Sequence, residues 1–266
     1  MDPISLIGIV GGIGLMLLAA ILEGTHLSSL FAPTALLIIG GGTFGATITC
    51  FSLEELLALR TGIKVAFAKP AQTAAELYVL MGDFATVARR EGLLALESRV
   101  AGIEYPLLKR GLRLMVDGTD PGLLKDLLIT EIAMTEEKMK TQASIFATAG
   151  GFAPCMGIIG TVMGLIHVLG NLSNPDALGP AIAVAFLATL YGIAFANCIF
   201  LPLGKKMVFV AKQGTQLDLM IVEGLISIQS GDNPRLVQEK LISFIEMEKR
   251  HELTQEKAGA GKPAEA

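Results

Sequence analysis

The sequence contains four long apolar stretches that carry no charged side chain. They cover residues 4–22, 34–51, about 145–169 and 181–203. A helix of about 20 apolar residues spans the roughly 30 Å of bilayer hydrocarbon, and a charged side chain at that depth is costly. We therefore predict four transmembrane helices. No Lys or Arg precedes the first stretch and no small-residue cleavage site follows it, so we interpret it as a retained helix and not a signal peptide.

All 21 Lys and Arg residues lie outside these stretches. Residues 52–144 contain 12 of them and residues 204–266 contain the other nine, whereas the short connections at 23–33 and 170–180 contain none. Basic residues near span ends mark the cytoplasmic side of a membrane. We therefore predict that both termini are cytoplasmic and that the two short connections face outward. The net charge of −4 gives no basic excess, and we expect no nucleic-acid partner.

The segment between the second and third spans is predicted to be a small helical domain on the cytoplasmic side. Ser52 and Glu55 have the spacing of a capping box, which predicts a helix that ends before Pro70. Further helices are predicted at residues 72–91, from Pro106 to a turn at 118–122, and from Leu123 into the third span. The predicted fold is therefore all-α.

The third and fourth spans are predicted to extend into the cytoplasm as long helices, the fourth as far as residue 230. Asn233 followed by Pro234 predicts an N-cap and the first turn of a last amphipathic helix that ends at about residue 252. The end of the chain is rich in Gly, Ala, Lys and Pro, and we expect it to be disordered. The predicted segments are 1–51 and 145–203 in the membrane, 52–144 and 204–256 in the cytoplasm, and the tail 257–266.

Three of the predicted spans contain glycines four residues apart, a spacing that lets membrane helices approach closely. The pairs are Gly8 with Gly12, Gly41 with Gly45, and Gly160 with Gly164. Two interpretations stay open for these pairs: packing within one chain, or packing between the subunits of an oligomer.

No catalytic or metal-binding motif is present. The sequence lacks G-x-S-x-G, H-E-x-x-H and a phosphate loop, its three histidines are far apart, and its three cysteines occur singly. We expect no enzyme activity, no cofactor and no metal site. The informative polar residues lie inside the spans. Pro154 and Pro202 each free a backbone carbonyl that needs a partner or a wet cavity, whereas Thr161 and Thr189 can bond either to their own helices or to a polar pathway.

The spans offer no ionisable side chain at depth, and proton and ion pathways usually need one. If this chain conducts a cation, the carboxylate must come from another polypeptide. The sequence therefore predicts a hetero-oligomer.

Four segments of the chain also resemble a known family. They are the third span from Gly150 to Leu169, the outer loop and fourth span from Asn174 to Pro202, the charged segment from Ala88 to Glu97, and the C-terminal segment from Gly231 to Phe244. Together they resemble the flagellar motor stator A subunits, the motility protein A branch of the MotA/TolQ/ExbB family. The resemblance covers nearly the whole chain in the same order.

This resemblance implies a homopentamer of A subunits around two B subunits in the bacterial inner membrane. Each B subunit would supply one membrane helix with an aspartate that carries protons or sodium ions. The cytoplasmic part would push the switch protein of the rotor's C-ring.

The resemblance also implies roles for individual residues. Arg89 with its neighbour Arg90, together with Glu97, matches the charges that engage the rotor, and Glu131 matches an acidic position that affects motility. Four more positions belong to the ion pathway. Pro154 and Pro202 match the prolines that couple ion flow to shape change, and Thr161 and Thr189 match the threonines that face the B aspartate.

Other functions stay open at this point. A TolQ/ExbB-type energiser of envelope transport would share the ion chemistry, but such relatives typically have three spans and an outer N-terminus. A membrane scaffold without ion flux is the third reading. A threonine at position 161 resembles sodium-type stators, but this is a single position. Both proton and sodium therefore stay open as the transported ion.

Overall fold

The computed structural model describes residues 3–68, 73–173, 175–248 and 250. Within these residues the chain is helical and contains no strand, so the prediction of an all-α fold is confirmed. The chain forms two compact units, one from Met1–Lys69 with Lys138–Ala211 and the other from Pro70–Glu137 with Lys212–Ala266. Helices α7 (Pro121–Gly170) and α9 (Leu201–Gln229) contribute residues to both units.

Four apolar helices coincide with the four predicted spans. Within the described residues, Leu27–Ile48, Pro121–Gly170 and Leu178–Gln229 are long and apolar enough to cross a membrane, and Ile7–Leu22 is a shorter apolar helix. The four-span topology and the segment boundaries stay predictions. The tail at 257–266, expected to be disordered, lies outside the described residues.

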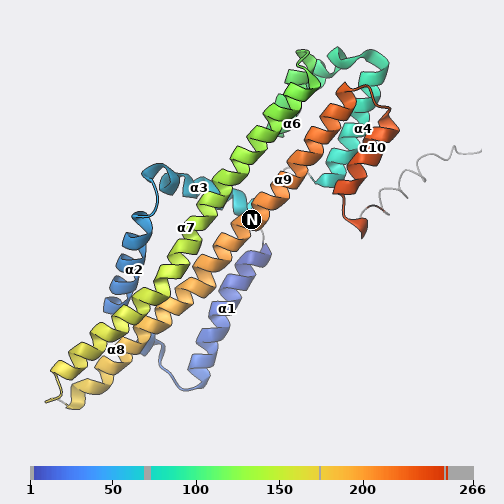
Figure 1. Cartoon of the computed structure of the whole chain (residues 1–266). Helices are drawn as coiled ribbons and strands as arrows, with labels where there is room; N and C mark the ends of the chain where they lie inside the picture. The colour runs from blue at the N-terminus through green and yellow to red at the C-terminus, as the bar shows by residue number, and fades with distance from the viewer. Residues whose placement is uncertain (1–2, 69–72, 174, 249, 251–266) are drawn as a thin grey trace, which may run out of the picture. The chain divides into compact units, whose positions relative to one another are not determined.

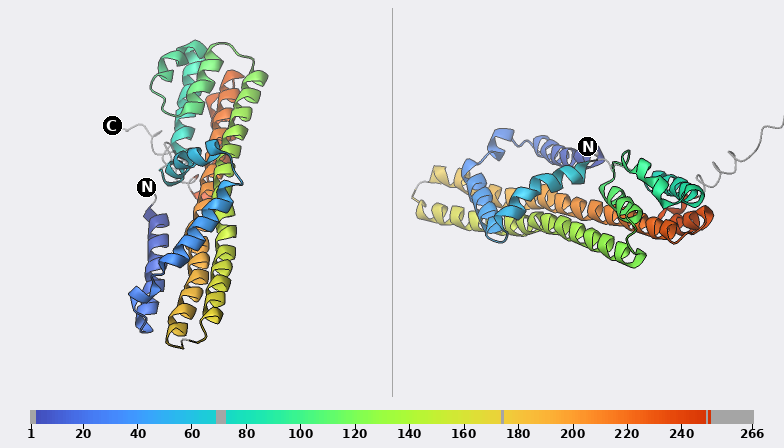
Figure 2. Two further views of the ribbon diagram at one scale, coloured as in Figure 1. Left: turned by 90° about the vertical axis from the view of Figure 1, so that its left-hand side faces the viewer. Right: turned by 90° about the horizontal axis from the view of Figure 1, so that it is seen from above.

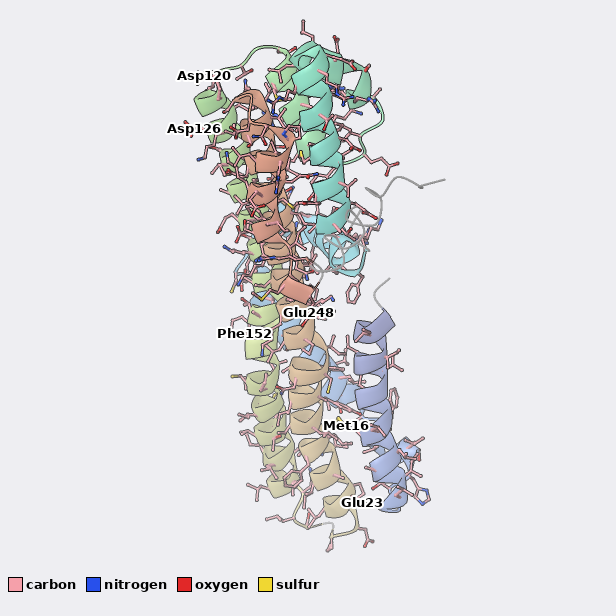
Figure 3. The ribbon with its side chains drawn as sticks, turned by 90° about the vertical axis from the view of Figure 1, so that its right-hand side faces the viewer. Met16, Glu23, Asp120, Asp126, Phe152 and Glu248 are labelled. Atoms are coloured by element: carbon pink, nitrogen blue, oxygen red, sulfur yellow. The ribbon has the colours of Figure 1, made fainter. Side chains whose placement is uncertain are left out.

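The first unit contains the apolar helices. Helix α2 packs against α8, and α1 packs against the π-helix η3, which lies between α8 and α9 (Figures 1 and 2). The side-chain view labels Met16 on α1 (Figure 3), and its sulfur lies 4.0 Å from Sγ of Cys198 in η3. The bounds are α1 Pro3–Leu22, η1 Leu27–Leu30, α2 Pro33–Ile48, α3 Leu53–Phe67, α8 Pro175–Ala194 and η3 Phe195–Phe200.

The second unit packs short helices against the ends of α7 and α9. Its core is apolar, and Met81, Leu108, Leu128, Leu225 and Val237 are each 0% exposed. These five side chains come from five different helices, so the core holds all of those helices together. The remaining bounds are α4 Ala74–Glu91, η2 Leu93–Leu96, α5 Glu97–Val100, α6 Pro106–Val116, α10 Pro234–Leu241 and η4 Ile242–Phe244.

Helix starts agree well with the local sequence signals. The Ser52 hydroxyl accepts a hydrogen bond from the Glu55 amide at 3.3 Å, and the Glu55 carboxylate accepts one from the Ser52 amide at 2.8 Å. The predicted capping box is therefore confirmed. Asn233 caps α10 as predicted, because its side-chain oxygen accepts from the Leu236 amide at 2.8 Å. Gly92 ends α4 with a φ of +86°, a conformation that glycine adopts at little cost.

Several predicted boundaries are wrong. Helix α7 begins at Pro121, inside the turn predicted at 118–122, because the Asp120 carboxylate (Figure 3) accepts hydrogen bonds from the amides of Gly122 and Leu123. Helix α2 ends at Ile48, three residues before the end of the charge-free stretch at 34–51, and the chain then turns toward the Ser52 cap.

Two further boundaries in the second half of the chain also differ. Helix α8 begins at Pro175 and passes through Pro180, so much of the predicted outer connection is helical. Helix α10 ends at Leu241, and the predicted helix end near residue 252 lies outside the described residues. After η4 the backbone is extended at Ile245, whose side chain is only 2% exposed, so core packing outweighs the helical pattern there.

Candidate ion pathway and charged surface

Helices α7 and α8 touch at the level of their backbones. A Cβ atom added to Gly157 would lie 3.0 Å from the carbonyl oxygen of Ala188 and 3.1 Å from Cα of Thr189. A Cβ atom added to Gly192 would lie 2.5 Å from the carbonyl oxygen of Ala153. A Cβ atom at Gly192 would be too close to the Ala153 carbonyl oxygen for any side chain, and one at Gly157 would require the helices to move apart by a few tenths of an ångström, so the glycines bring the helices into contact.

The predicted pair Gly160 and Gly164 belongs to the same α7–α8 contact. Added Cβ atoms would lie 2.7 Å from Cβ of Ala188 and 2.6 Å from Cβ of Ala185, respectively. For this pair, the interpretation as packing within one chain is confirmed. The pairs on α1 and α2 differ, because no described atom lies within 4 Å of a Cβ added at Gly8, Gly12, Gly41 or Gly45.

Thr161 and Thr189 meet across the glycine contact, where their hydroxyl groups hydrogen-bond to each other. The Thr161 hydroxyl also lies 2.9 Å from the carbonyl oxygen of Ala185 on α8 and 3.1 Å from that of Gly157 on its own helix. Both threonines are partly buried. The structure therefore brings the two predicted threonines together, and one of their bonds is of the ordinary intrahelical kind.

The two predicted prolines occupy different local structures. Pro154 lies inside α7, which continues unbroken from Pro121 to Gly170. Pro202 is the second residue of α9, two positions after the end of the π-helix η3, and π-turns are one of the usual causes of a local change in helix geometry. The Asn197 amide group donates to the carbonyl oxygen of Ile193 at 3.0 Å, next to the point where α8 changes to π geometry.

Tyr191 joins α8 to the segment before α2. Its hydroxyl group donates to the carbonyl oxygen of Leu30 and accepts from the amide of Ala32 at 3.1 Å. Our sequence-based list of site residues omitted this tyrosine. The available signal was the residue type, because a buried tyrosine hydroxyl usually finds a hydrogen-bond partner.

The charged residues predicted to meet a rotor lie in the second unit. Arg89 and Arg90 are exposed in the last turn of α4, and Glu97 is exposed at the start of α5. Glu97 lines a shallow surface hollow together with Glu91 and Leu94. None of the three predicted side chains forms an ion pair within the described part of the chain.

Glu131 is not grouped with those residues. Its carboxylate accepts from the Arg110 guanidinium at 2.6 Å, so α7 and α6 share an ion pair that is 32% and 55% exposed at its two side chains. An ion pair with this exposure contributes about 0–1 kcal/mol.

A neighbouring acid on α9 has a strongly altered acidity. Burial raises the pKa of Asp218 to about 6, although the hydrogen bond from Tyr105 opposes this and the nearby Glu131 charge adds to it. The pKa of Tyr105 is also raised, first by burial and then by the charge of Asp218. Nothing in the sequence pattern of these residues indicated the contact.

Two apolar helices are in backbone contact, a hydroxyl pair joins them, and the apolar stretches contain no Asp, Glu, Lys or Arg. These features define a helical membrane protein. Comparison of the sequence with known protein families identifies the family of this membrane protein. Residues 99–218 match the MotA/TolQ/ExbB proton channel family, and residues 6–92 match the motility protein A N-terminal family. The chain belongs to the MotA/TolQ/ExbB proton channel family.

Individual relatives match over nearly their whole length. Motility protein A of Bacillus subtilis (strain 168) is 36% identical over 246 residues, which cover 92% of this chain and 91% of that protein. The structure of the flagellar MotAB stator complex from Bacillus subtilis contains a chain that is 35% identical, with a TM-score of 0.88 over 93% of this chain and 98% of that one. A chain in the structure of C. jejuni MotAB is 31% identical, also with a TM-score of 0.88, and the match covers 93% and 97% of the two chains.

Proposed function

We propose that this chain is an ion-conducting stator subunit of the bacterial flagellar motor, and that it couples a proton or sodium current to torque. The observation that carries the proposal is the hydroxyl pair of Thr161 and Thr189, which lies between two apolar stretches that contain no Asp, Glu, Lys or Arg. An ion crossing there needs a carboxylate from a second polypeptide. A B subunit with one membrane aspartate would supply it. The solved complexes to which this chain is similar are MotAB complexes, which supports a B partner.

The proposed pathway uses the four membrane residues in two roles. The hydroxyl groups of Thr161 and Thr189 would face the B aspartate and accept or donate hydrogen bonds as its protonation or ion load changes. Pro154 and Pro202 would couple that change to helix shape. The π-helix before Pro202 supports this role, because a π-turn can shift its hydrogen-bond register with little disruption of the flanking helix.

The proposed assembly is a homopentamer around two B subunits in the inner membrane, with both termini in the cytoplasm. The glycine pair on α2 supports an oligomer, because no described atom outside the helix's own backbone lies within 4 Å of a Cβ added at Gly41 or Gly45. The one-sided distribution of Lys and Arg supports the orientation.

The proposed rotor contact is made by the switch protein of the C-ring with Arg89, Arg90 and Glu97. These side chains are exposed and form no ion pair in the described residues, so they are accessible to a charged partner. Glu131 would act differently, by holding Arg110 on α6. Contacts between exposed charges should weaken as salt concentration rises.

A TolQ/ExbB-type energiser of envelope transport is the alternative within the same family. The match of residues 6–92 to the motility protein A N-terminal family favours the stator. A stator drives flagellar rotation, whereas an energiser drives envelope transport. A swimming assay therefore distinguishes the two functions.

The test is co-expression with the B subunit of a motile relative in cells that lack their own stator. We expect ion uptake into the cells and restored swimming. Thr189→Val, which removes a hydroxyl at nearly constant volume, should lower ion uptake, while Thr148→Val on α7, outside the hydroxyl pair, serves as the matched control. A sodium gradient at constant pH and a pH gradient without sodium identify the ion.

Three results would count against the proposal. If no B subunit supports ion uptake, the result would favour a membrane scaffold without ion flux. Uptake without swimming would favour the envelope energiser. Equal conduction by Thr189→Val and the unchanged chain would remove the hydroxyl pair from the pathway.

A further inference from the structure

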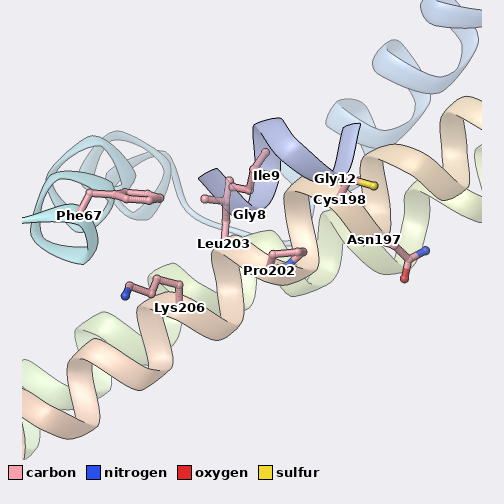
Figure 4. A pocket seen from close by; sticks show the side chains of 9 residues that line it. All are labelled: Gly8, Ile9, Gly12, Phe67, Asn197, Cys198, Pro202, Leu203 and Lys206. Atoms are coloured by element: carbon pink, nitrogen blue, oxygen red, sulfur yellow. The ribbon is translucent and has the colours of Figure 1, made fainter. Parts of the chain in front are cut away.

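A cavity of about 470 Å³ opens between α1, the end of α3 and the start of α9 (Figure 4). All of its lining residues belong to the first unit. Its volume falls within the range of about 300–1,000 Å³ that is typical of small-molecule sites. The α7–α8 glycine contact and the Thr161–Thr189 hydroxyl pair do not line it, although Pro202 does, so the cavity lies apart from the place where the ion is proposed to pass.

The walls of the cavity are apolar along most of their length. Gly8 and Gly12 form its α1 side, where no described atom lies within 4 Å of an added Cβ, so the missing side chains leave room along the helix. Ile9 and Leu203 add aliphatic side chains, and Phe67 from the end of α3 adds an aromatic ring. A hydrocarbon chain matches this surface, because it gains from leaving water and has no polar group to desolvate.

One charged residue lines the same cavity. Lys206 lies at the same end of the cavity as Phe67, and Asn197 lies at the other end (Figure 4). The Lys206 ammonium group lies 5.7 Å from the centre of the Phe209 ring. Lys206 follows the charge-free stretch at 181–203, so its charge falls at the depth where an apolar span gives way to the polar boundary of a bilayer.

We propose that this cavity binds one anionic phospholipid per chain, with an acyl chain along Gly8 and Gly12 and the phosphate beside Lys206. The apolar walls select a lipid tail, and the cation selects an anionic headgroup over a zwitterionic one. A lysine near a membrane surface favours an anionic lipid by a free energy that corresponds to about fivefold in affinity. A lipid also reaches a cavity between membrane helices by lateral diffusion, without crossing the bilayer.

The cavity gives such a lipid a structural consequence. Cys198 from η3 and Pro202 just after it line the same space as α1. A bound acyl chain would fill the gap between α1 and the π-helical segment and limit how far that segment can move. This proposal depends only on the membrane location of the helices and not on the stator function.

The test is native mass spectrometry of the full chain, purified from membranes in the assembly that it forms and then titrated with phosphatidylglycerol or phosphatidylcholine. We expect about fivefold stronger retention of phosphatidylglycerol, up to one lipid per chain. Lys206→Gln should abolish this preference, and Lys205→Gln, an exposed neighbour outside the cavity lining, should leave it intact. Gly12→Leu should reduce retention of both lipids, while Gly14→Leu, outside the lining, should not.

Equal retention of the two lipids by the unchanged chain would overturn the proposal. Equal effects of Lys206→Gln and Lys205→Gln would also overturn it, because they would indicate a general surface attraction. If either lysine variant fails to assemble, the headgroup preference of the unchanged chain and the glycine variants still decide the question. No motility or ion flux is measured, so this result is independent of the test of the proposed function.

Discussion

Replacing Gly157 with alanine tests whether backbone contact between α7 and α8 is essential. The new Cβ atom would lie 3.0 Å from the carbonyl oxygen of Ala188 and 3.1 Å from Cα of Thr189. Both are backbone atoms, so no rotamer change relieves the contact and the helices must separate. Overpacking of this kind costs about 1–3 kcal/mol, which outweighs the gain of up to about 1 kcal/mol in helix propensity.

Gly151→Ala provides the matched control. Gly151 lies on the same helix, six residues away, but no described atom lies within 4 Å of its added Cβ. The same chemical change should therefore be neutral or stabilising by up to about 1 kcal/mol. The two variants together separate the effect of the α7–α8 contact from the effect of adding a methyl group to this helix.

The assay is the thermal unfolding of the purified chain in detergent, followed by far-ultraviolet circular dichroism, with ion uptake measured in cells. Gly157→Ala should unfold at a lower temperature than the unchanged chain, and its ion uptake should fall because the Thr161–Thr189 hydroxyl pair lies across the same contact. Gly151→Ala should keep both properties. If Gly157→Ala matches Gly151→Ala in stability, the backbone contact is not what holds these helices together.

Three further changes test other contacts. Because burial raises the pKa of Asp218 to about 6 from 3.8, the folded chain binds more protons than the unfolded chain between those values, and stability should fall as pH rises through that window. Asp218→Asn keeps an acceptor for Tyr105 and should raise stability at pH 7.5 by about 1–2 kcal/mol, allowing for partial exposure, with no gain below about pH 4 in thermal melts. Tyr191→Phe removes the bond to the Leu30 carbonyl and should cost about 1–3 kcal/mol, seen as faster amide hydrogen exchange of the Ala32 amide. Thr73→Ala removes the side-chain cap of α4 and should cost about 1 kcal/mol, measured by urea unfolding of the full chain.

The sequence predicts helices well where the cause is local. The spans follow from the absence of charge over about 20 residues, which is a property of each segment alone. The starts of α3 and α10 follow from Ser52 with Glu55 and from Asn233 with Pro234, whose partners lie within three residues. The end of α10 does not follow from its amphipathic pattern, because burial of Ile245 depends on the core of the second unit.

The candidate site was predicted in part. Thr161 and Thr189 were chosen as polar residues inside apolar spans, and they are hydrogen-bonded partners in the structure. The glycine contact was recognised only at Gly160 and Gly164, although Gly157 lies one turn earlier, three residues before Gly160, and faces the same helix α8. A third small residue at helical spacing was the signal that extends the contact.

Contacts between residues far apart in the chain were not predictable in this way. The Arg110–Glu131 pair joins residues 21 positions apart, and the Tyr191–Leu30 bond joins residues 161 positions apart. Each depends on how two helices pack, and a single sequence does not contain that information. The π-helix η3 belongs in the same group: Pro202 predicts a disturbed backbone, but not whether a kink, a break or a π-turn absorbs it.

The order of features along α8 and α9 places a stiff segment next to an adaptable one. From Ala185 to Gly192 the helix is held against α7 by contacts that leave no room for compression. Three residues later the π-helix begins, and Pro202 follows its end. A displacement at Thr189 therefore cannot be absorbed by α8 moving into α7, whereas a π-turn can absorb it by shifting hydrogen-bond register. We expect the backbone amides of Phe195–Phe200 to exchange hydrogen faster than those on the α8 side of Gly192. Uniform exchange across both segments would contradict the assignment of the π-helix as the place where the helix changes shape.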